Sequence, residues 1–254
     1  MYHYIIFLVA MQAARLELKF IAEKMRNRFT VPDRLEGTAW SPKVMSLPPG
    51  ERFLVLSPHP DDDAVGCGGT LIKLLDAGKA VRVVYFSMQE GAFTREERER
   101  EIEAALKELG VKDVRSRRSA AFPSPKEATA IIAEEISSFA PDGVFVPSPF
   151  ENHNEHIRTF ESFLGAVGDR GSGPDAIMYE VWGPLMPNLL VPITDVWERK
   201  SAAVRAHRTQ VREIDYVRAA QGLNGYRAAT MAIDGYAEAF LHLPSSSLLR
   251  TFCR

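Results

Sequence analysis

The sequence has little of what marks several classes of protein. Its 254 residues contain only two cysteines, Cys67 and Cys253, which is too few for the disulfide framework of a secreted domain. We therefore expect a reducing compartment and a cytoplasmic protein. There is no excess of positive charge either: 31 lysines and arginines stand against 33 aspartates and glutamates, a formal net charge of -2. Nucleic acid is accordingly not an expected partner.

Long hydrophobic runs are also missing. The apolar run at residues 5–10 is far shorter than the roughly 18 residues that a membrane span requires, and no Lys or Arg precedes it as in a signal peptide. We predict an amphipathic helix over residues 1–28 that packs on the domain or between the subunits of a homo-oligomer. Attachment to a membrane surface is the weaker alternative.

The remainder of the chain has the composition of a globular protein, with 46% hydrophobic and 25% charged residues. Residues 30–50 are rich in proline and turn-forming residues, which is typical of a connecting loop. We therefore predict an N-terminal helix and connecting loop over residues 1–50, followed by a single domain over residues 51–254.

Strands and helices alternate along this domain. Short apolar runs predict strands at 53–57, 80–86 and 143–146, with a shorter one at 111–115; amphipathic patterns predict helices at 69–76, 94–109, 126–139 and 154–167. Beyond residue 173 the pattern is less regular, with strands expected at 177–182 and 189–193 and helices at 197–206 and 211–220. Such alternation predicts an α/β, Rossmann-like fold: a mostly parallel sheet with helices on both faces.

Two polar clusters directly follow predicted strands, one after residues 53–57 and the other after residues 143–146. Between them they contain His59, Asp61, Asp62, Asp63, His153 and His156. Ligands of open parallel sheets bind beyond the carboxyl ends of the strands, so we expect both clusters to lie at one edge of the sheet.

Histidine and aspartate together suit zinc. A catalytic zinc ion typically has three protein ligands and one position open for water. His59, one aspartate of the first cluster and one histidine of the second would supply three ligands, and a further aspartate and histidine would remain to move protons. The sequence therefore predicts a hydrolase with one Zn2+ per chain at the carboxyl edge of the strands.

Structural alternatives stand beside these interpretations. The aspartates at 61–63 could instead cap the following helix, and the histidine pair of the second cluster could be surface residues. The glycines at 66–69 do not have dinucleotide-binding spacing, because Leu71 stands where that motif requires glycine. They are better suited to bring the backbone close to the metal loop.

At this point the sequence resembles the PIG-L/LmbE-like family of zinc-dependent N-acetylglucosaminyl deacetylases. The first family motif stands here as Pro58-His59-Pro60-Asp61-Asp62-Asp63, followed by Gly66-Cys67-Gly68-Gly69-Thr70-Leu71, and the second stands as His153-Asn154-Glu155-His156. Further matches are Arg98, Glu101, Ala105, Leu109 and Gly110, and the segment Ala206-His207-Arg208-Thr209-Gln210.

This resemblance implies hydrolysis of an N-acetyl amide on an amino-sugar-like small molecule. It implies zinc ligation by His59, Asp62 and His156. It also implies Asp61 as the general base that activates the attacking water, His153 as the group that steadies the oxyanion or protonates the leaving amine, and Arg98 as a substrate contact. For Arg98 the alternative is a solvated position on a charged helix face.

Two residues depart from the family pattern: Asp63 replaces the commoner glutamate, and Glu155 replaces the aspartate of the second motif. The longer Glu155 side chain is expected to shift the contacts around the ligands. Two other functions remain open, an amidase acting on a thiol-sugar conjugate and a non-catalytic zinc- or sugar-binding protein. An unused aspartate beside the predicted site favours catalysis.

Overall fold

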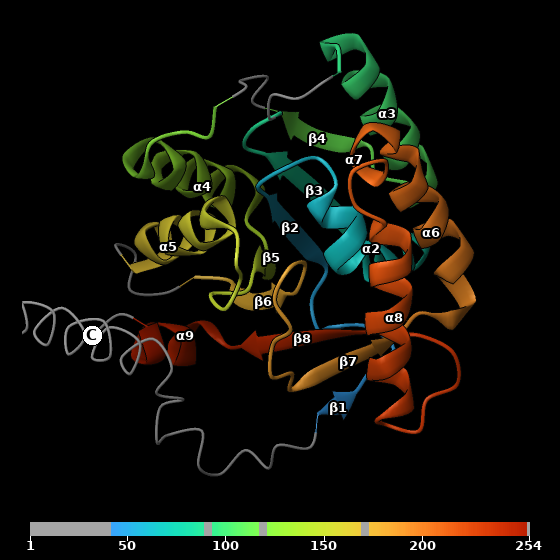
Figure 1. Cartoon of the computed structure of the whole chain (residues 1–254). Coiled ribbons are helices and arrows are strands. Elements are labelled where there is room, and N and C mark those ends of the chain that lie inside the picture. The colour runs from blue at the N-terminus through green and yellow to red at the C-terminus, as the bar shows by residue number, and fades with distance from the viewer. Residues whose placement is uncertain (1–41, 89–92, 117–120, 169–172, 253–254) are drawn as a thin grey trace, which may run out of the picture. The chain divides into compact units, whose positions relative to one another are not determined.

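The computed structural model describes residues 42–88, 93–116, 121–168 and 173–252 (Figure 1). The helix predicted over residues 1–28 lies outside these ranges, and the division at residue 50 stays a prediction. The elements in chain order are β1 (Lys43–Val44), β2 (Arg52–Ser57), α2 (Asp62–Asp76), β3 (Ala80–Tyr85), α3 (Arg95–Leu109), β4 (Asp113–Ser116), α4 (Pro125–Phe139), β5 (Gly143–Pro147), α5 (Asn154–Gly168), β6 (Asp175–Tyr179), β7 (Leu189–Pro192), η2 (Thr194–Val196), α6 (Trp197–Ala206), α7 (Arg208–Val211), α8 (Tyr216–Ala229), β8 (Ala237–Leu243) and α9 (Ser245–Phe252).

One mixed sheet runs through the described residues in the order β1-β7-β8-β6-β5-β2-β3-β4. The five strands from β6 to β4 are parallel, whereas β8 is antiparallel to both β6 and β7. The predicted α/β fold with a mostly parallel sheet is thereby confirmed. No helix among the described residues is long and apolar enough to span a bilayer.

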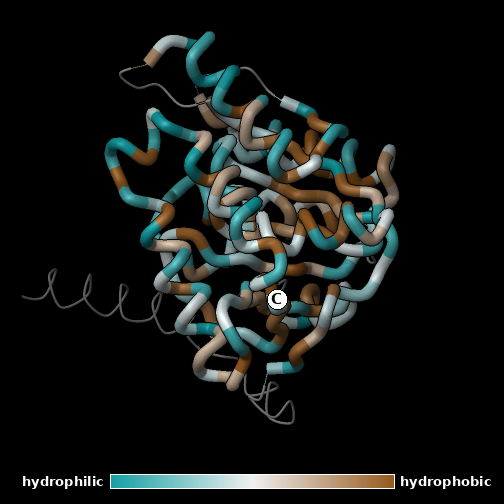
Figure 2. Tube along the Cα trace, turned by 90° about the vertical axis from the view of Figure 1, so that its right-hand side faces the viewer, coloured by the Kyte–Doolittle hydropathy of each residue, from teal (hydrophilic) through white to brown (hydrophobic). Residues whose placement is uncertain are grey.

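Helices cover both faces of the sheet, with α4 and α5 on one face and α2, α3, α6 and α8 on the other (Figure 1). Strand β2 contributes side chains to the hydrophobic core on both faces of the sheet. Leu54 and Leu56 pack on the face covered by α4 and α5, whereas Phe53 and Val55 pack on the face covered by α2. Because both faces are covered, β2 is apolar at nearly every position rather than at alternate ones. Figure 2 shows the hydrophobic residues gathered along the inner segments.

The strand order reverses between β2 and β5. β3 and β4 lie to one side of β2, whereas β5 and β6 lie to its other side, and β2 and β5 pair directly through Phe53–Gly143 to Val55–Phe145. Such a switch point opens a crevice at the carboxyl ends of the two central strands, because their connections leave toward opposite faces. The two polar clusters of the sequence follow these two strands.

Several predicted boundaries were wrong. Helix α2 begins at Asp62 rather than at Gly69, so the glycine-rich segment lies inside the helix. Helix α8 spans 216–229 instead of 211–220, and β8 and α9 were not predicted. The glycines permit close packing of α2: a Cβ on Gly66 would lie 2.3 Å from Cδ2 of Tyr179, and one on Gly69 would lie 2.8 Å from Ile193.

A methyl group at position 66 should therefore destabilise the fold. We expect Gly66→Ala to lower the free energy of unfolding by about 1–3 kcal/mol, because α2 must move away from the buried Tyr179 ring. Gly222→Ala is a matched control on α8, where the added Cβ meets nothing within 4 Å and helix propensity should keep or raise stability. Urea denaturation of both variants tests this, and equal midpoints would contradict the packing argument.

Candidate active site

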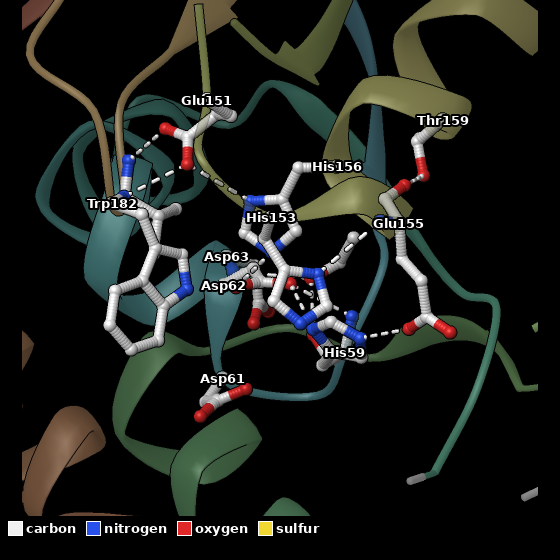
Figure 3. Close-up of polar contacts among 12 residues, drawn as sticks. His59, Asp61, Asp62, Asp63, Glu151, His153, Glu155, His156, Thr159 and Trp182 are labelled. Atoms are coloured by element: carbon white, nitrogen blue, oxygen red, sulfur yellow. Dashed lines mark hydrogen bonds and ion pairs between the residues drawn. The ribbon is translucent and has the colours of Figure 1, made fainter. Parts of the chain in front are cut away.

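The three histidines of the two clusters converge at the switch point (Figure 3). His59 follows β2, whereas His153 directly precedes α5 and His156 lies in its first turn, beyond the end of β5. Ring centroids are 4.9 Å apart for His59 and His153, 5.0 Å for His153 and His156, and 5.4 Å for His59 and His156. One nitrogen from each ring lies within 4.8 Å of the others, so the group is able to hold a metal ion.

Asp62 lies between two of these histidines. Its Oδ2 is 3.1 Å from Nδ1 of His59, and its Oδ1 is 3.2 Å from Nε2 of His156. Ligand atoms around a tetrahedral zinc ion, each about 2.0–2.1 Å from the metal, are separated by roughly 3.3 Å. Each Asp62 oxygen thus lies at about this spacing from one histidine nitrogen.

The outer nitrogen of each of these two rings faces a second carboxylate. Nε2 of His59 lies 2.5 Å from Oε2 of Glu155, and Nδ1 of His156 lies 3.3 Å from Oε2 of Glu151. Metal-binding histidines commonly donate their other N–H group to a carboxylate, which fixes the tautomer and the ring orientation. Glu155, which replaces the aspartate of the second family motif, therefore contacts His59 of the first motif and orients its ring.

The charges of this cluster fit a bound cation. A neutral imidazole carries one N–H, yet both nitrogens of His59 and of His156 face carboxylates. Without a metal ion the surplus negative charge is met by protons: burial lowers the pKa of His156, but Asp62 and Glu151 outweigh it and raise the pKa to about 10. A divalent cation between Asp62 and the two rings would neutralise the same carboxylates, and this N, N, O donor set is typical of zinc.

His153 differs from the other two histidines. It precedes α5, and its Nδ1 accepts a hydrogen bond of 3.3 Å from the backbone N–H of Glu155. In the neutral ring this contact places the proton on Nε2, so that nitrogen is able to donate a hydrogen bond. Burial and the neighbouring histidines lower the pKa of His153, and the residue is only partly buried.

Asp61 occupies the N-cap position of α2 but does not cap it. Its side chain makes no hydrogen bond to the helix backbone, so the structural alternative of helix capping does not apply to this residue. Its Oδ1 lies 3.5 Å from Nη2 of Arg98, and only 7% of the residue is exposed. Burial raises the pKa of Asp61 against the opposing charge of Arg98, which brings this carboxylate closer to the basicity that a general base requires.

Arg98 lies inside the protein rather than on a solvated helix face, since only 1% of it is exposed. Its Nη1 lies 3.2 Å from Nδ1 of His207, whose pKa is held well below its usual range by burial and by the Arg98 charge. One helical turn later, Glu101 accepts hydrogen bonds from the N–H (2.9 Å) and hydroxyl (2.7 Å) of Thr209. Helix α3 and the segment at residues 206–210, which lie far apart in the chain, are thus in contact next to Asp61. The contact of Arg98 with substrate stays a prediction.

Three residues of this region were not predicted from the sequence: Glu151, Trp182 and Tyr216. Glu151 lies in the cluster that follows β5, so its position was a usable signal. Trp182 and Tyr216 gave no such signal. Trp182 lies in the loop after β6, whereas Tyr216 begins α8, so only the fold brings the two residues together. Their rings contact each other edge to face, with centroids 5.7 Å apart.

Comparison with known proteins gives this geometry a context. Residues 54–167 match the sequence model of the family PIG-L, described as GlcNAc-PI de-N-acetylase. The chain is 30% identical over 194 residues to the diacetylchitobiose deacetylase of Thermococcus kodakarensis, an alignment that covers 64% of this chain and 71% of that protein. The chain belongs to the PIG-L family. The matched residues contain the whole of both polar clusters.

Other known proteins resemble this chain in sequence or in fold. The 2'-N-acetylparomamine deacetylase of Streptomyces fradiae is 30% identical over 158 residues, 51% of this chain and 56% of that protein. A conserved protein of Thermus thermophilus superimposes with a TM-score of 0.67 at 27% identity, covering 77% of this chain and 96% of that one. The N,N'-diacetylchitobiose deacetylase of Pyrococcus horikoshii shares the fold, with a TM-score of 0.65 at 24% identity over 91% of this chain and 94% of that one.

These matches confirm the predicted family and, with it, a hydrolytic N-deacetylase rather than a non-catalytic binding protein. The predicted ligands His59, Asp62 and His156 lie together, and the predicted catalytic residues Asp61 and His153 border them. Among the described residues, the cluster of His59, His153 and His156 could hold a metal ion.

Proposed function

We propose that this PIG-L family member is a zinc-dependent hydrolase that removes the acetyl group from the nitrogen of an amino sugar. The main support for this proposal is the position of Asp62, because its two oxygens each lie within 3.2 Å of a nitrogen from a different histidine. His59, Asp62 and His156 would hold the ion. Glu155 and Glu151 would keep the two imidazoles in the ligating tautomer.

Bound zinc would polarise the amide carbonyl and lower the pKa of water to about 7. Asp61 then takes a proton from the attacking water. This role suits a carboxylate that is nearly buried and leaves the helix N-terminus uncapped. Arg98, whose guanidinium lies beside it, holds the Asp61 side chain in place and limits the rise of its pKa.

His153 would act on the leaving group. The backbone N–H of Glu155 occupies its Nδ1, so Nε2–H is available to donate a hydrogen bond to the oxyanion of the tetrahedral intermediate or a proton to the departing amine. The free amine and acetate then leave. A proton-transfer group of this kind typically contributes about 10²–10⁴-fold to the rate.

The substrate class comes from the relatives whose names state acetylated amino sugars, diacetylchitobiose and 2'-N-acetylparomamine. An amidase acting on a thiol-sugar conjugate would use the same metal site, so it is the second candidate. Residues outside the metal site must separate the two.

Metal analysis and a substrate panel test this proposal together. We expect about one zinc per purified chain and acetate release from N-acetylated amino sugars, both lost with a chelator and restored by Zn2+. Zinc with cleavage of only a thiol conjugate would favour the second candidate. Absence of both metal and acetate release would overturn the proposal.

A further inference from the structure

An aromatic pair borders the metal site and has no part in the proposed proton transfers. Trp182, from the loop after β6, is 39% exposed, and its indole meets the ring of Tyr216 edge to face at an interplanar angle of 81°. The indole projects beside the histidines in the close-up view (Figure 3). A single exposed aromatic ring is ordinary on a protein surface, but an indole beside a polar site offers a ligand a large apolar face next to hydrogen-bonding groups.

The loop that carries Trp182 is anchored to the metal site. The buried Glu151 carboxylate accepts hydrogen bonds from the backbone N–H groups of Val181 (2.7 Å), Trp182 (2.9 Å) and Gly183 (3.4 Å), and it also faces His156. Gly183 lies so close to the chain before Glu151 that a Cβ there would come within 2.6 Å of the Phe150 carbonyl oxygen. The backbone of Trp182 is therefore fixed relative to a predicted metal ligand.

Tyr216 is placed by a different element. It is the first residue of α8, and the Asp215 side chain caps that helix by accepting from the N–H of Arg218. The negative charges of the site act on Tyr216: burial raises the pKa of its hydroxyl group, and the carboxylates of Asp61 and Asp62 raise that pKa further. The two rings thus reach the site from separate elements and meet at its border.

We propose that the Trp182 indole, held by its edge-to-face contact with Tyr216, is the surface on which the pyranose ring of the N-acetyl substrate rests. This inference rests on the proposed deacetylase function. The C–H groups on one face of a pyranose are apolar, whereas its rim carries hydroxyl groups, so an aromatic wall beside a polar centre matches both. The wall binds the sugar, and the metal and proton-transfer groups act on the acetamido group that projects from it.

Steady-state kinetics of Trp182→Ala with two substrates test this role. With N-acetylglucosamine we expect KM to rise about 10-fold while kcat stays close to that of the unchanged protein, because one aromatic contact is lost. With N-acetylethanolamine, which has the same amide but no ring, kcat/KM should not change. Trp182→Phe should recover most of the affinity. An unchanged KM for the sugar, or equal losses with both substrates, would overturn the proposal.

Tyr226→Ala is the matched control. Tyr226 is also an aromatic residue of α8 and is 61% exposed, but it lies ten residues beyond Tyr216, about 15 Å along the helix. Its loss should leave both substrates unaffected. The zinc content of every variant should equal that of the unchanged protein, which separates sugar binding from damage to the metal site.

A binding measurement keeps this inference separate from the proposed function. Glucosamine titrated into chelator-treated protein should change the tryptophan fluorescence, and Trp182→Ala should abolish that change although Trp40 and Trp197 remain. If the unchanged protein cleaves no N-acetyl sugar, the proposed function fails whatever the titration gives. If it cleaves the sugar but Trp182→Ala binds glucosamine as tightly, the aromatic surface is wrong and the deacetylase remains.

Discussion

Asp61→Asn is expected to lower kcat by about 10²–10⁴-fold while zinc stays bound. Asparagine keeps the size of the side chain and one carbonyl oxygen beside Arg98, but its amide cannot take a proton from water. The side chain makes no cap for α2, and Glu101 also lies 3.6 Å from the Arg98 guanidinium, so this buried cation keeps a charged partner in the variant. Acetate release at saturating substrate and the zinc content of the purified variant measure the two effects.

The neighbouring substitution Asp62→Asn gives the matched contrast. Asp62 faces both His59 and His156, so its loss should remove zinc and activity together. The two variants change adjacent aspartates in the same way and should separate a base from a ligand. Full activity of Asp61→Asn would refute the assignment of the base, and loss of zinc from it would make Asp61 a ligand.

Glu151→Gln is expected to weaken zinc binding by about 10–100-fold, the usual cost of losing a carboxylate behind a metal-binding histidine. The Glu151 carboxylate accepts three backbone N–H groups and faces Nδ1 of His156. The NH2 group of glutamine cannot accept, so at least one of these contacts becomes a repulsion between donors. Chelator competition measures the affinity, and excess Zn2+ should recover part of the activity.

Glu161→Gln is a suitable control, because it makes the same chemical change at an exposed position of α5. It should bind zinc like the unchanged protein. A Glu151→Gln variant with unaltered zinc affinity would show that the orientation of His156 does not depend on this carboxylate. A large loss of thermal stability at saturating zinc would instead assign Glu151 mainly to holding the loop at residues 181–183.

Much of the parallel half of the fold followed from local patterns. The runs at 53–57 and 143–146 are apolar at consecutive positions, as strands covered on both faces must be. Strand β8 was not predicted, because Glu238 interrupts the apolar pattern of residues 237–243. That carboxylate is fully buried and pairs at 2.6 Å with Nζ of Lys200, a partner 38 residues away that no local pattern reveals. The start of α2 was placed late for a similar reason, since its glycines pack against Tyr179 and Ile193.

The sequence by itself determined the chemistry of the site: histidines and aspartates directly after two strands, in the two motifs of one family. The tertiary structure decided which nitrogen of each histidine faces Asp62, which carboxylates orient the rings, and that Trp182 and Tyr216 stand beside them. The contact of His59 with Glu155 spans 96 residues and depends on the pairing of β2 with β5. Residue types and spacing predict what a site is able to do, because ligand chemistry belongs to side chains. Their orientation depends on packing between distant segments, which only the folded chain determines.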